Sequence, residues 1–400
     1  MKITSFEPFW LVKNGLIQSY PSLKKSIKTD VLIIGGGITG SLIAHQCVND
    51  GYDTVLIDKR EIAHGSTSAT TSMLQYEIDV PLYKLIDLIG ENNAVKSYKV
   101  CYKSIDRLEK IVREIGSTCG FKKKESLYFA ASKKDSKWLY KEFEARKKYG
   151  LNVSWLTDVD IRDRYRLHKT YGGILSKQAA SIDAFQFTHD VLKYNAARGL
   201  RIFDKTELTT IRYADDCVYA EVESKHVIEA KKIIYCTGYE TTNLIEENFV
   251  DLFNTYAIVG EQNEDDQSDL NETLFWNTAS PYIYMRTTDD NRLLIGGEDK
   301  KFGKVTNGKL IEKKSEKLKK YINKHLPHYD FTIDFSWAGT FGETKDGNPY
   351  IGEHKDFPNS LFVLGFGGNG ITFSVIGMDI VSKLLKNQTH ELVDIYRFGR

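Results

Sequence analysis

Three glycines at fixed spacing, Gly35, Gly37 and Gly40, give this 400-residue sequence its clearest chemical signal. They lie between a β-branched apolar run at 31–35 and a segment at 38–48 with the apolar spacing of a helix. In this context Gly-x-Gly-x-x-Gly is a dinucleotide fingerprint: it permits a tight turn, a close approach to a pyrophosphate and close helix packing. The helix N-terminus then offers N–H groups to phosphates. The alternative is a glycine-rich turn that serves packing alone.

Asp58 ends the next expected strand, at 53–59, and follows Gly40 by 18 residues. A carboxylate at that position accepts hydrogen bonds from ribose hydroxyls and repels a 2′-phosphate, which disfavours NADP. The segment 65–73 then follows, and six of its nine residues are Ser or Thr. Small hydroxyl side chains can wrap a long polar ligand, whereas an NAD domain would continue directly into further β–α units. An ordinary polar loop is the alternative.

A second Gly-x-Gly-x-x-Gly occurs in "GFGGNGIT" at 365–372, again between an expected strand and an expected helix. Only 30 residues follow Gly370, and they contain no clear second strand that ends in an acid. We therefore expect this helix N-terminus to face a different developing anion, such as the N1–C2 edge of a reduced flavin.

The expected elements that would position these residues begin as alternating strands and helices, and longer helical zones and strand-rich segments follow. Asp30 to Asp58 reads as one β–α–β unit, and 82–116 and 134–149 read as helical zones. A helix with a Ser/Asp start is expected at 181–200, and strands at 125–132, 208–213, 217–222 and 231–238. Segments 254–296 are mostly of strand type, 308–324 is a charged helix, and a last helix covers about 373–386.

The composition excludes several classes of protein. Lys plus Arg (55) and Asp plus Glu (54) leave a formal charge of +1, so no global field attracts nucleic acid or an anionic membrane. The five cysteines are odd in number, widely spaced and without C-x-x-C, which argues against disulfides, zinc and iron–sulfur clusters and fits a cytoplasmic location. We find no secretory signal, and the longest uncharged run, 31–49, is too rich in glycine for a membrane span.

Taken in order, several segments carry a family resemblance. They are "PFW" (8–10), "YPSL" (20–23), "DVLIIGGGITG", "VLIDK", the Ser/Thr segment, "IIYCTGYE" (233–240), "YIYMR" with "RLLIGGE", "DGNPYIGEH" and "LGFGGNGIT". The chain resembles the D-amino-acid-oxidase-like superfamily of FAD-dependent oxidoreductases, which includes glycine and sarcosine oxidases. It looks closest to the branch often fused to a Rieske domain, although this sequence ends before such a domain and lacks its Cys/His pairs.

The resemblance implies an α/β protein in which a Rossmann-type FAD-binding domain is assembled from residues 1–80, 151–250 and 335–400. A substrate domain of α+β type, with an antiparallel sheet over the flavin, would comprise 81–150 and 251–334. It also implies these contacts to noncovalent FAD: Gly35, Gly37, Ile38, Thr39, Gly40, Asp58, Lys59, Ser66, Thr67, Thr70, Thr71, Ser72, Leu208, Thr237, Gly238, Gly367, Gly368, Asn369, Gly370 and Ile371.

In such enzymes a C–H next to nitrogen gives a hydride to flavin N5, and no protein base is needed if the amine arrives neutral. Two positions depart from the family. Phe341 stands where glycine-oxidase-like members carry a carboxylate-binding arginine, and Thr372 where sarcosine-oxidase-like members carry a lysine. A simple α-amino acid would then need another cation, and Arg286 and Lys345 are the candidates.

Strand alternation puts Tyr282, Tyr284 and Arg286 on one face, and this face would supply substrate contacts if it looks at the flavin. The alternative is a face packed on helices with Arg286 in a surface ion pair. We take Tyr284, Arg286, Tyr256 and Lys345 as the catalytic candidates, with no metal site, and Trp337 and Phe341 as core or cavity wall.

The leading functional reading is an FAD-dependent oxidoreductase, oxidase or dehydrogenase, for an amine or amino-acid derivative. The second reading is an FAD protein that passes electrons to a protein partner. A flavin-binding protein without turnover and an NAD-only dehydrogenase are further alternatives. A small-molecule substrate is the expected partner, without nucleic acid and without a membrane span.

Overall fold

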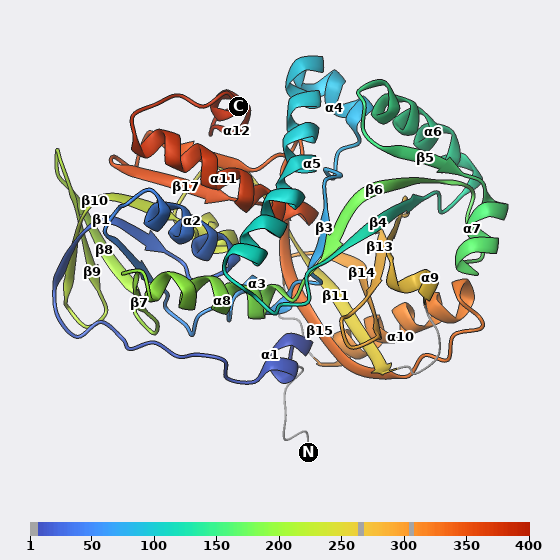
Figure 1. The fold of residues 1–400 in the computed structure, drawn as a ribbon, viewed down its shortest axis with the longest axis horizontal. Helices are drawn as coiled ribbons and strands as arrows, with labels where there is room; N and C mark the ends of the chain where they lie inside the picture. Colours follow the sequence, from blue (N-terminus) through green and yellow to red (C-terminus); the bar gives the residue numbers. More distant parts are fainter. Residues whose placement is uncertain (1–6, 263–267, 304–307) are drawn as a thin grey trace.

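The computed structural model describes residues 7–262, 268–303 and 308–400, and its strands form two sheets that lie side by side in Figure 1. We call them sheet A and sheet B. Sheet A lies with α2, α8 and α11 in one half of the molecule, and sheet B lies with α6, α7, α9 and α10 in the other. The long helix α5 runs between the halves.

Sheet A has the order β16-β17-β10-β1-β2-β7, and β8 and β9 extend it beside β10. Its core strands are parallel, with β1 between β10 and β2. Strand β10 is long enough to pair with β9 through its first half and with β17 through its second half. The strands are β1 (Ile27–Ile34), β2 (Thr54–Ile57), β7 (Arg201–Phe203), β8 (Leu208–Tyr213), β9 (Val218–Val222), β10 (Val227–Tyr235), β16 (Tyr350–Glu353) and β17 (Ser360–Leu364).

Sheet B has the order β15-β11-β14-β13-β12-β4-β6-β3, with β5 beside β6. Its neighbours are antiparallel except for the parallel pair β12 and β4. The strands are β3 (Met73–Gln75), β4 (Lys122–Phe129), β5 (Val153–Leu156), β6 (Gly173–Ser181), β11 (Asp251–Gln262), β12 (Thr273–Asn277), β13 (Ile283–Thr287), β14 (Arg292–Lys301) and β15 (Ile333–Glu343).

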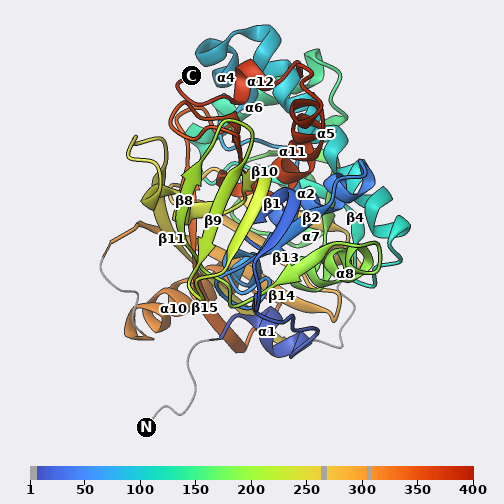
Figure 2. The ribbon, with the colours of Figure 1, turned by 90° about the vertical axis from the view of Figure 1, so that its left-hand side faces the viewer.

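Helices pack on one face of sheet A and on both faces of sheet B, where α6 and α7 cover opposite faces of β4 and β6 (Figures 1 and 2). Helix α2 packs against α8 and α11, and α10 packs on β11, β14 and β15. The helices are α1 (Phe9–Asn14), α2 (Ile38–Asn49), α3 (Ser66–Ala69), α4 (Leu82–Ile89), α5 (Glu91–Glu114), α6 (Lys133–Lys148), α7 (Asp158–Tyr165), α8 (Ala184–Ala196), α9 (Ser268–Asn271), α10 (Gly308–His325), α11 (Gly370–Leu385) and α12 (Val393–Tyr396). The 3₁₀ turns are η1 (Gly238–Asn243) and η2 (Gly367–Asn369).

Local sequence explains several boundaries. Gly90, with φ +84°, separates α4 from α5 inside the zone expected to be one helical stretch. Asp183 caps α8 by accepting a hydrogen bond from the Gln186 N–H, which confirms the predicted helix start. Helix α7 begins with a capping box between Thr157 and Asp160, a helix that the periodicity did not reveal.

The sheets divide the chain differently from the expected ranges. Strands β5 and β6 and most of β15 fall in ranges assigned above to the FAD-binding domain, yet they pair in sheet B. Pairing of this kind is decided by partners far away along the chain, such as β4 for β6 and β11 for β15. Within the described residues, no helix is long and apolar enough to cross a membrane.

Candidate functional site

A cavity of about 940 Å³ lies between the two sheets. Its sheet A wall is formed by the segments that follow the carboxyl ends of β1, β2, β10 and β17, where ligands bind in open parallel sheets. Its sheet B wall comes from β3, β11, β13 and β15, together with Phe302, which follows β14. The cavity is large enough for a dinucleotide with room for a small substrate.

The first glycine turn is a place where side chains do not fit. Gly35 has φ +109°, and a Cβ there would lie 2.4 Å from the Cys236 carbonyl oxygen. A Cβ on Gly40 would lie 1.8 Å from the Gly35 oxygen, because α2 starts directly against the end of β1. Gly37 lines the cavity, where a Cβ would meet only the Thr67 hydroxyl at 3.0 Å. Bare backbone therefore faces the cavity at the N-terminus of α2.

Asp58 organises this turn. Its carboxylate accepts hydrogen bonds from the Gly36 N–H at 2.7 Å and the Arg60 N–H at 2.8 Å. Burial raises the pKa of Asp58, and these two N–H groups lower it in part. A carboxylate has about four accepting positions, so two remain for ligand hydroxyls.

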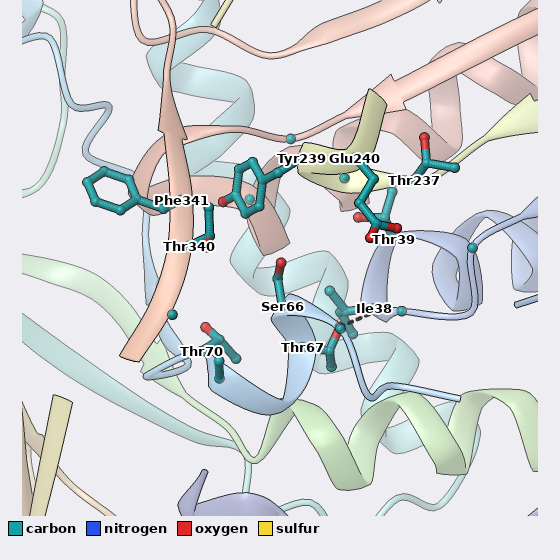
Figure 3. A pocket seen from close by; sticks show the side chains of 18 of the residues that line it. Ile38, Thr39, Ser66, Thr67, Thr70, Thr237, Tyr239, Glu240, Thr340 and Phe341 are labelled. Carbon is teal, nitrogen blue, oxygen red and sulfur yellow. Dashed lines mark hydrogen bonds between the residues drawn. The ribbon is translucent and has the colours of Figure 1, made fainter. Parts of the chain in front are cut away.

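Helix α3 carries the Ser/Thr segment along the floor of the cavity (Figure 3). The Thr67 hydroxyl accepts the Ile38 N–H at 3.0 Å, which links this segment to the start of α2. Ser66, Thr70 and Thr71 also line the cavity. Hydroxyl groups thus continue the polar path from the glycine turn toward sheet B.

Three side chains from distant parts of the chain hold the 69–71 segment. Trp337, Trp10 and Arg286 donate hydrogen bonds of 2.9, 2.6 and 2.7 Å to the carbonyls of residues 69, 70 and 71, in that order. The Arg286 guanidinium also lies over the Trp10 ring at 5.3 Å. We call these side chains the carbonyl clamp. The carbonyl clamp binds the backbone carbonyls of the 69–71 segment, and the hydroxyls of Thr70 and Thr71 in this segment line the cavity.

The second glycine turn faces the same cavity. Gly367 and Gly368 line it at the N-terminus of α11, and the Gly368 N–H donates to Asp79 at 3.0 Å. Asn369 lies outside the lining and donates from its side chain to the Gln75 carbonyl at 3.0 Å. Both glycine turns therefore meet at one ligand site, as expected for a single long ligand.

The sheet B wall is aromatic. Tyr282 and Tyr284 line the cavity with ring centroids 5.5 Å apart. Gly296 makes room for Tyr284, since a Cβ there would lie 2.4 Å from the ring. The Tyr284 hydroxyl lies 3.1 Å from the Thr255 hydroxyl. Burial raises the pKa of both tyrosines, so the phenols stay protonated near neutral pH.

Most of the residues implied by the resemblance lie around this cavity, and a few do not. The lining contains Gly35, Gly37, Ile38, Thr39, Asp58, Lys59, Ser66, Thr67, Thr70, Thr71, Leu208, Thr237, Gly238, Gly367, Gly368, Gly370 and Ile371. Gly40, Ser72 and Asn369 lie just behind the lining. Gly40 is packed against β1, and Ser72 is buried at φ +55°.

The catalytic candidates are distributed unevenly. Tyr284 lines the cavity, and Arg286, Tyr256 and Lys345 do not. Arg286 is 2% exposed, and its guanidinium is bonded to backbone carbonyls, including that of Ile182 at 3.0 Å. Tyr256 is buried in the core between sheet B and α10, and Lys345 is exposed in the turn before β16. Arg286 is thus not in a surface ion pair.

Several lining residues were not among the predicted contacts. Trp337 and Phe341, expected above to be core or cavity wall, alternate with Gly339 along β15, and all three line the cavity together with Thr340. Tyr239 and Glu240 in η1 also line the cavity, and Tyr239 lies beside Thr340 of β15 in Figure 3. The alternation along β15 could have been predicted from the sequence. The position of η1 depends on where β10 ends, which the sequence pattern does not give.

These features fit an FAD-type ligand. The glycine turn leaves room for a pyrophosphate, Asp58 keeps accepting positions for a ribose, and the second helix N-terminus faces the far end of the cavity. The described residues contain no group of three or more side chains that could hold a metal ion.

A dinucleotide cradle beneath an antiparallel wall defines a flavoprotein-type fold. Residues 30–383 match the family described as DAO, FAD dependent oxidoreductase, and the chain belongs to this family, with FAD as its cofactor. The match covers most of the chain and includes both glycine turns. The resemblance inferred from the ordered segments is confirmed.

Three similar proteins illustrate the range of the family. The putative Rieske 2Fe-2S iron-sulfur protein YhfW of Bacillus subtilis is 24% identical over 409 residues, which is 98% of this chain and 75% of the relative. A glycine oxidase of Bacillus licheniformis is 27% identical over 86% of this chain and 89% of its own. The structure of L-proline dehydrogenase from P. horikoshii superimposes with a TM-score of 0.78 at 19% identity, covering 94% and 97% of the two chains. This likeness confirms the fold.

Proposed function

We propose that this FAD-dependent oxidoreductase oxidises an amine or amino-acid derivative, and that FAD, when bound, takes a hydride at N5 from a C–H next to nitrogen. The observation that carries the proposal is a cavity with a dinucleotide cradle on one wall and neutral aromatic side chains on the other. The named activities of the glycine oxidase and proline dehydrogenase relatives support the same class of substrate.

The chain's own residues would bind and orient rather than exchange protons. Tyr282 and Tyr284 stay protonated, so they can donate hydrogen bonds but cannot act as general bases near neutral pH. Phe341 and Trp337 would exclude water from the reacting centre. In the substrate, the C–H electron pair leaves with the hydrogen, the nitrogen lone pair forms C=N⁺, and water later hydrolyses this product.

We assign the cofactor contacts to the lining residues of both glycine turns, Asp58 and the Ser/Thr segment, with Gly40, Ser72 and Asn369 as supports behind them. The protein would bind FAD noncovalently. Cys236 lines the cavity, but burial raises the pKa of its thiol strongly and leaves it a poor nucleophile. Arg286 would position the 69–71 segment rather than touch the substrate.

The test is anaerobic reduction of the purified holoprotein by a panel of amines and N-methyl amino acids. We expect the oxidised flavin bands to bleach with at least one member. Recolouring on admission of air would identify an oxidase, and recolouring only with an added acceptor would identify a dehydrogenase. Colourless protein that takes up no FAD in a titration, or holoprotein that no amine bleaches, would overturn the proposal.

A second candidate is an electron-transfer flavoprotein of the same fold that delivers electrons to a protein partner. The name of the YhfW relative, a putative Rieske iron–sulfur protein, favours it. Reoxidation of the bleached protein by an added Rieske protein, at a rate that oxygen does not match, would favour this candidate over an oxidase.

A further inference from the structure

We propose that the substrate binds as a cationic amine that carries no carboxylate beside the reacting carbon, and that its ammonium proton passes to water before the hydride leaves, which restores the nitrogen lone pair. The inference rests on the function proposed above and narrows its substrate class. The cavity itself defines the site, and the inference comes from which charges its two walls carry.

The sheet B wall presents aromatic and small polar groups to the cavity. Within the described residues, the lining side chains from β11, β13 and β15 and from the segments beside β13 and β14 include no charged group. The aromatic members are Tyr282, Tyr284, Phe302, Trp337 and Phe341. Aromatic rings attract an ammonium through their negative faces.

The lysine and arginine that line the cavity lie at its other end. Lys59 and Arg60 follow β2, and both pair with Glu240, at 3.1 and 2.5 Å. They are therefore already paired, and they lie next to Asp58 on the sheet A wall. A substrate carboxylate at sheet B would find no cation among the described lining residues there.

Arg286 does not repair this deficit. It lies two residues beyond Tyr284 on β13, but its Nε, Nη1 and Nη2 donate to the backbone carbonyls of residues 71, 287 and 182. If the Arg286 side chain turned into the cavity, those carbonyls would lose their donors. The ion pair that it would then form with a substrate carboxylate would also have to be desolvated. A carboxylate ligand is therefore disfavoured by the sheet B wall as built.

Three carboxylates lie close to residues of the cavity lining on this side. Asp79 accepts the N–H of Gly368, a lining residue, at 3.0 Å. Glu343 follows Phe341 by two residues and so shares its face of β15. Asp299 on β14 interacts with Thr255, another lining residue, and its Oδ1 is buried without a hydrogen-bond partner in the described part of the chain.

These three carboxylates act on one another and on Tyr282, a lining residue, so their charges reach this side of the cavity. Lys314, the cation that acts on Asp299, is already paired with Glu298 at 2.9 Å. A concave, partly dry surface with this excess of negative charge concentrates cations. Aromatic faces and outer carboxylates together match an alkylammonium.

Binding without turnover tests the inference directly. The holoprotein is titrated with benzyltrimethylammonium and, separately, with phenylacetate, while flavin absorption and heat release are followed. We expect saturable binding of the cation, at least about tenfold tighter than that of the carboxylate. Equal or tighter binding of phenylacetate, or no saturable binding of the cation, would overturn the inference.

Two variants locate the charge. Asp79→Asn keeps an oxygen for the Gly368 N–H, and Asp299→Asn removes the charge on β14. Each should weaken cation binding by about three- to tenfold and leave phenylacetate unchanged or improved. Asp216→Asn, in the exposed turn between β8 and β9, is the matched control. If one variant fails to load FAD, the other still decides, and full cation affinity in a loaded variant contradicts the assignment of that carboxylate.

A substrate pair separates this inference from the function on which it rests. N-methylglycine and N-methylethanolamine differ mainly in a carboxylate and a hydroxymethyl group beside the same N-methyl amine. Faster anaerobic bleaching by N-methylglycine would overturn the inference and leave the proposed function standing. If no amine bleaches the flavin, the proposed function fails, and the binding titration still decides the charge preference of the cavity.

Discussion

The two walls of the cavity are built from different materials. On the sheet A side, the ligand would meet backbone N–H groups, glycines and short hydroxyl side chains, each a few residues beyond a strand end. On the sheet B side, it would meet large aromatic side chains from strands between β11 and β15. The sheet A wall is determined by local backbone geometry, and the sheet B wall is determined by which strands pair with one another. Substitutions in the two walls should therefore have different effects: those in the sheet A wall on FAD binding, and those in the sheet B wall on substrate binding.

The largest expected effect comes from the backbone wall. Gly40→Ala would place a Cβ 1.8 Å from the Gly35 carbonyl oxygen, which only a shift of α2 away from β1 could relieve. We expect colourless or insoluble protein, since such a clash costs more than about 3 kcal/mol. Gly303→Ala, whose Cβ would have its nearest neighbour at 4.0 Å, is the control and should load FAD normally. A yellow Gly40→Ala protein with unchanged FAD affinity would contradict this account of the turn.

This contrast also explains what could be predicted from the sequence. The turn at Gly35 and the acid at Asp58 are coded within one β–α–β unit, so their positions followed from spacing alone. The Ser/Thr segment was readable for the same reason. Arg286 was not, because alternation gives the face of a strand but not whether the end of a long side chain turns back to backbone carbonyls.

The sequence also could not predict which sheet each strand joins. The segment of β6 lies between two helices along the chain, and its role in sheet B depends on β4, some fifty residues earlier. The acceptors that hold Trp10 and Trp337 lie in the 69–71 segment, which neither tryptophan adjoins in sequence. Contacts of this range are decided by the assembled fold, so single-sequence patterns carry little information about them.

The junction between the walls is the next place to test. Arg286→Lys keeps the positive charge, but an ammonium cannot reproduce a guanidinium that donates to several carbonyls. We expect FAD affinity to fall by about 2 kcal/mol, or roughly thirtyfold, measured by flavin fluorescence titration. With FAD saturating, the KM for the amine should stay close to that of the unmodified protein.

This result would separate positioning from substrate contact. A raised KM with unchanged FAD affinity would mean that Arg286 touches the substrate after all. Arg162→Lys, at an exposed position of α7, is the matched control and should change neither quantity. Burial lowers the pKa of Arg286 only to about 10, so the guanidinium is charged throughout the accessible pH range.

The sheet B wall should show its charges through pH. Burial raises the pKa of Asp79 and of Asp299 to about 6; the Gly368 N–H opposes the shift and Asp299 adds to it at Asp79, whereas at Asp299 Thr255 and Lys314 oppose it and Glu343 and Glu298 add to it. Glu343 and Tyr282 also interact with these carboxylates, and burial raises the pKa of both. Because the ionised carboxylates hold a cation, affinity for benzyltrimethylammonium should rise between pH 5 and 7.5, by about tenfold.

The quaternary ammonium does not titrate, so the pH profile would report the protein alone. Carboxylates with ordinary pKa values near ~4 would already be ionised at pH 5 and would give a flat profile. Asp79→Asn should reduce the rise without removing it, since Asp299 remains. A flat profile in the unmodified protein would detach these carboxylates from the ligand site.

The smallest effect tests the carbonyl clamp at a single bond. Trp10→Phe keeps a ring beneath Arg286 but removes the 2.6 Å hydrogen bond to the carbonyl of residue 70. We expect a loss of about 1 kcal/mol in unfolding free energy and a few-fold loss in FAD affinity. Trp138→Phe removes a comparable indole bond, to Asp135 at 3.3 Å, on α6 away from the cavity. If both variants lose stability and only Trp10→Phe loses FAD affinity, the clamp acts on the cofactor wall specifically; equal FAD affinities would make it a packing contact.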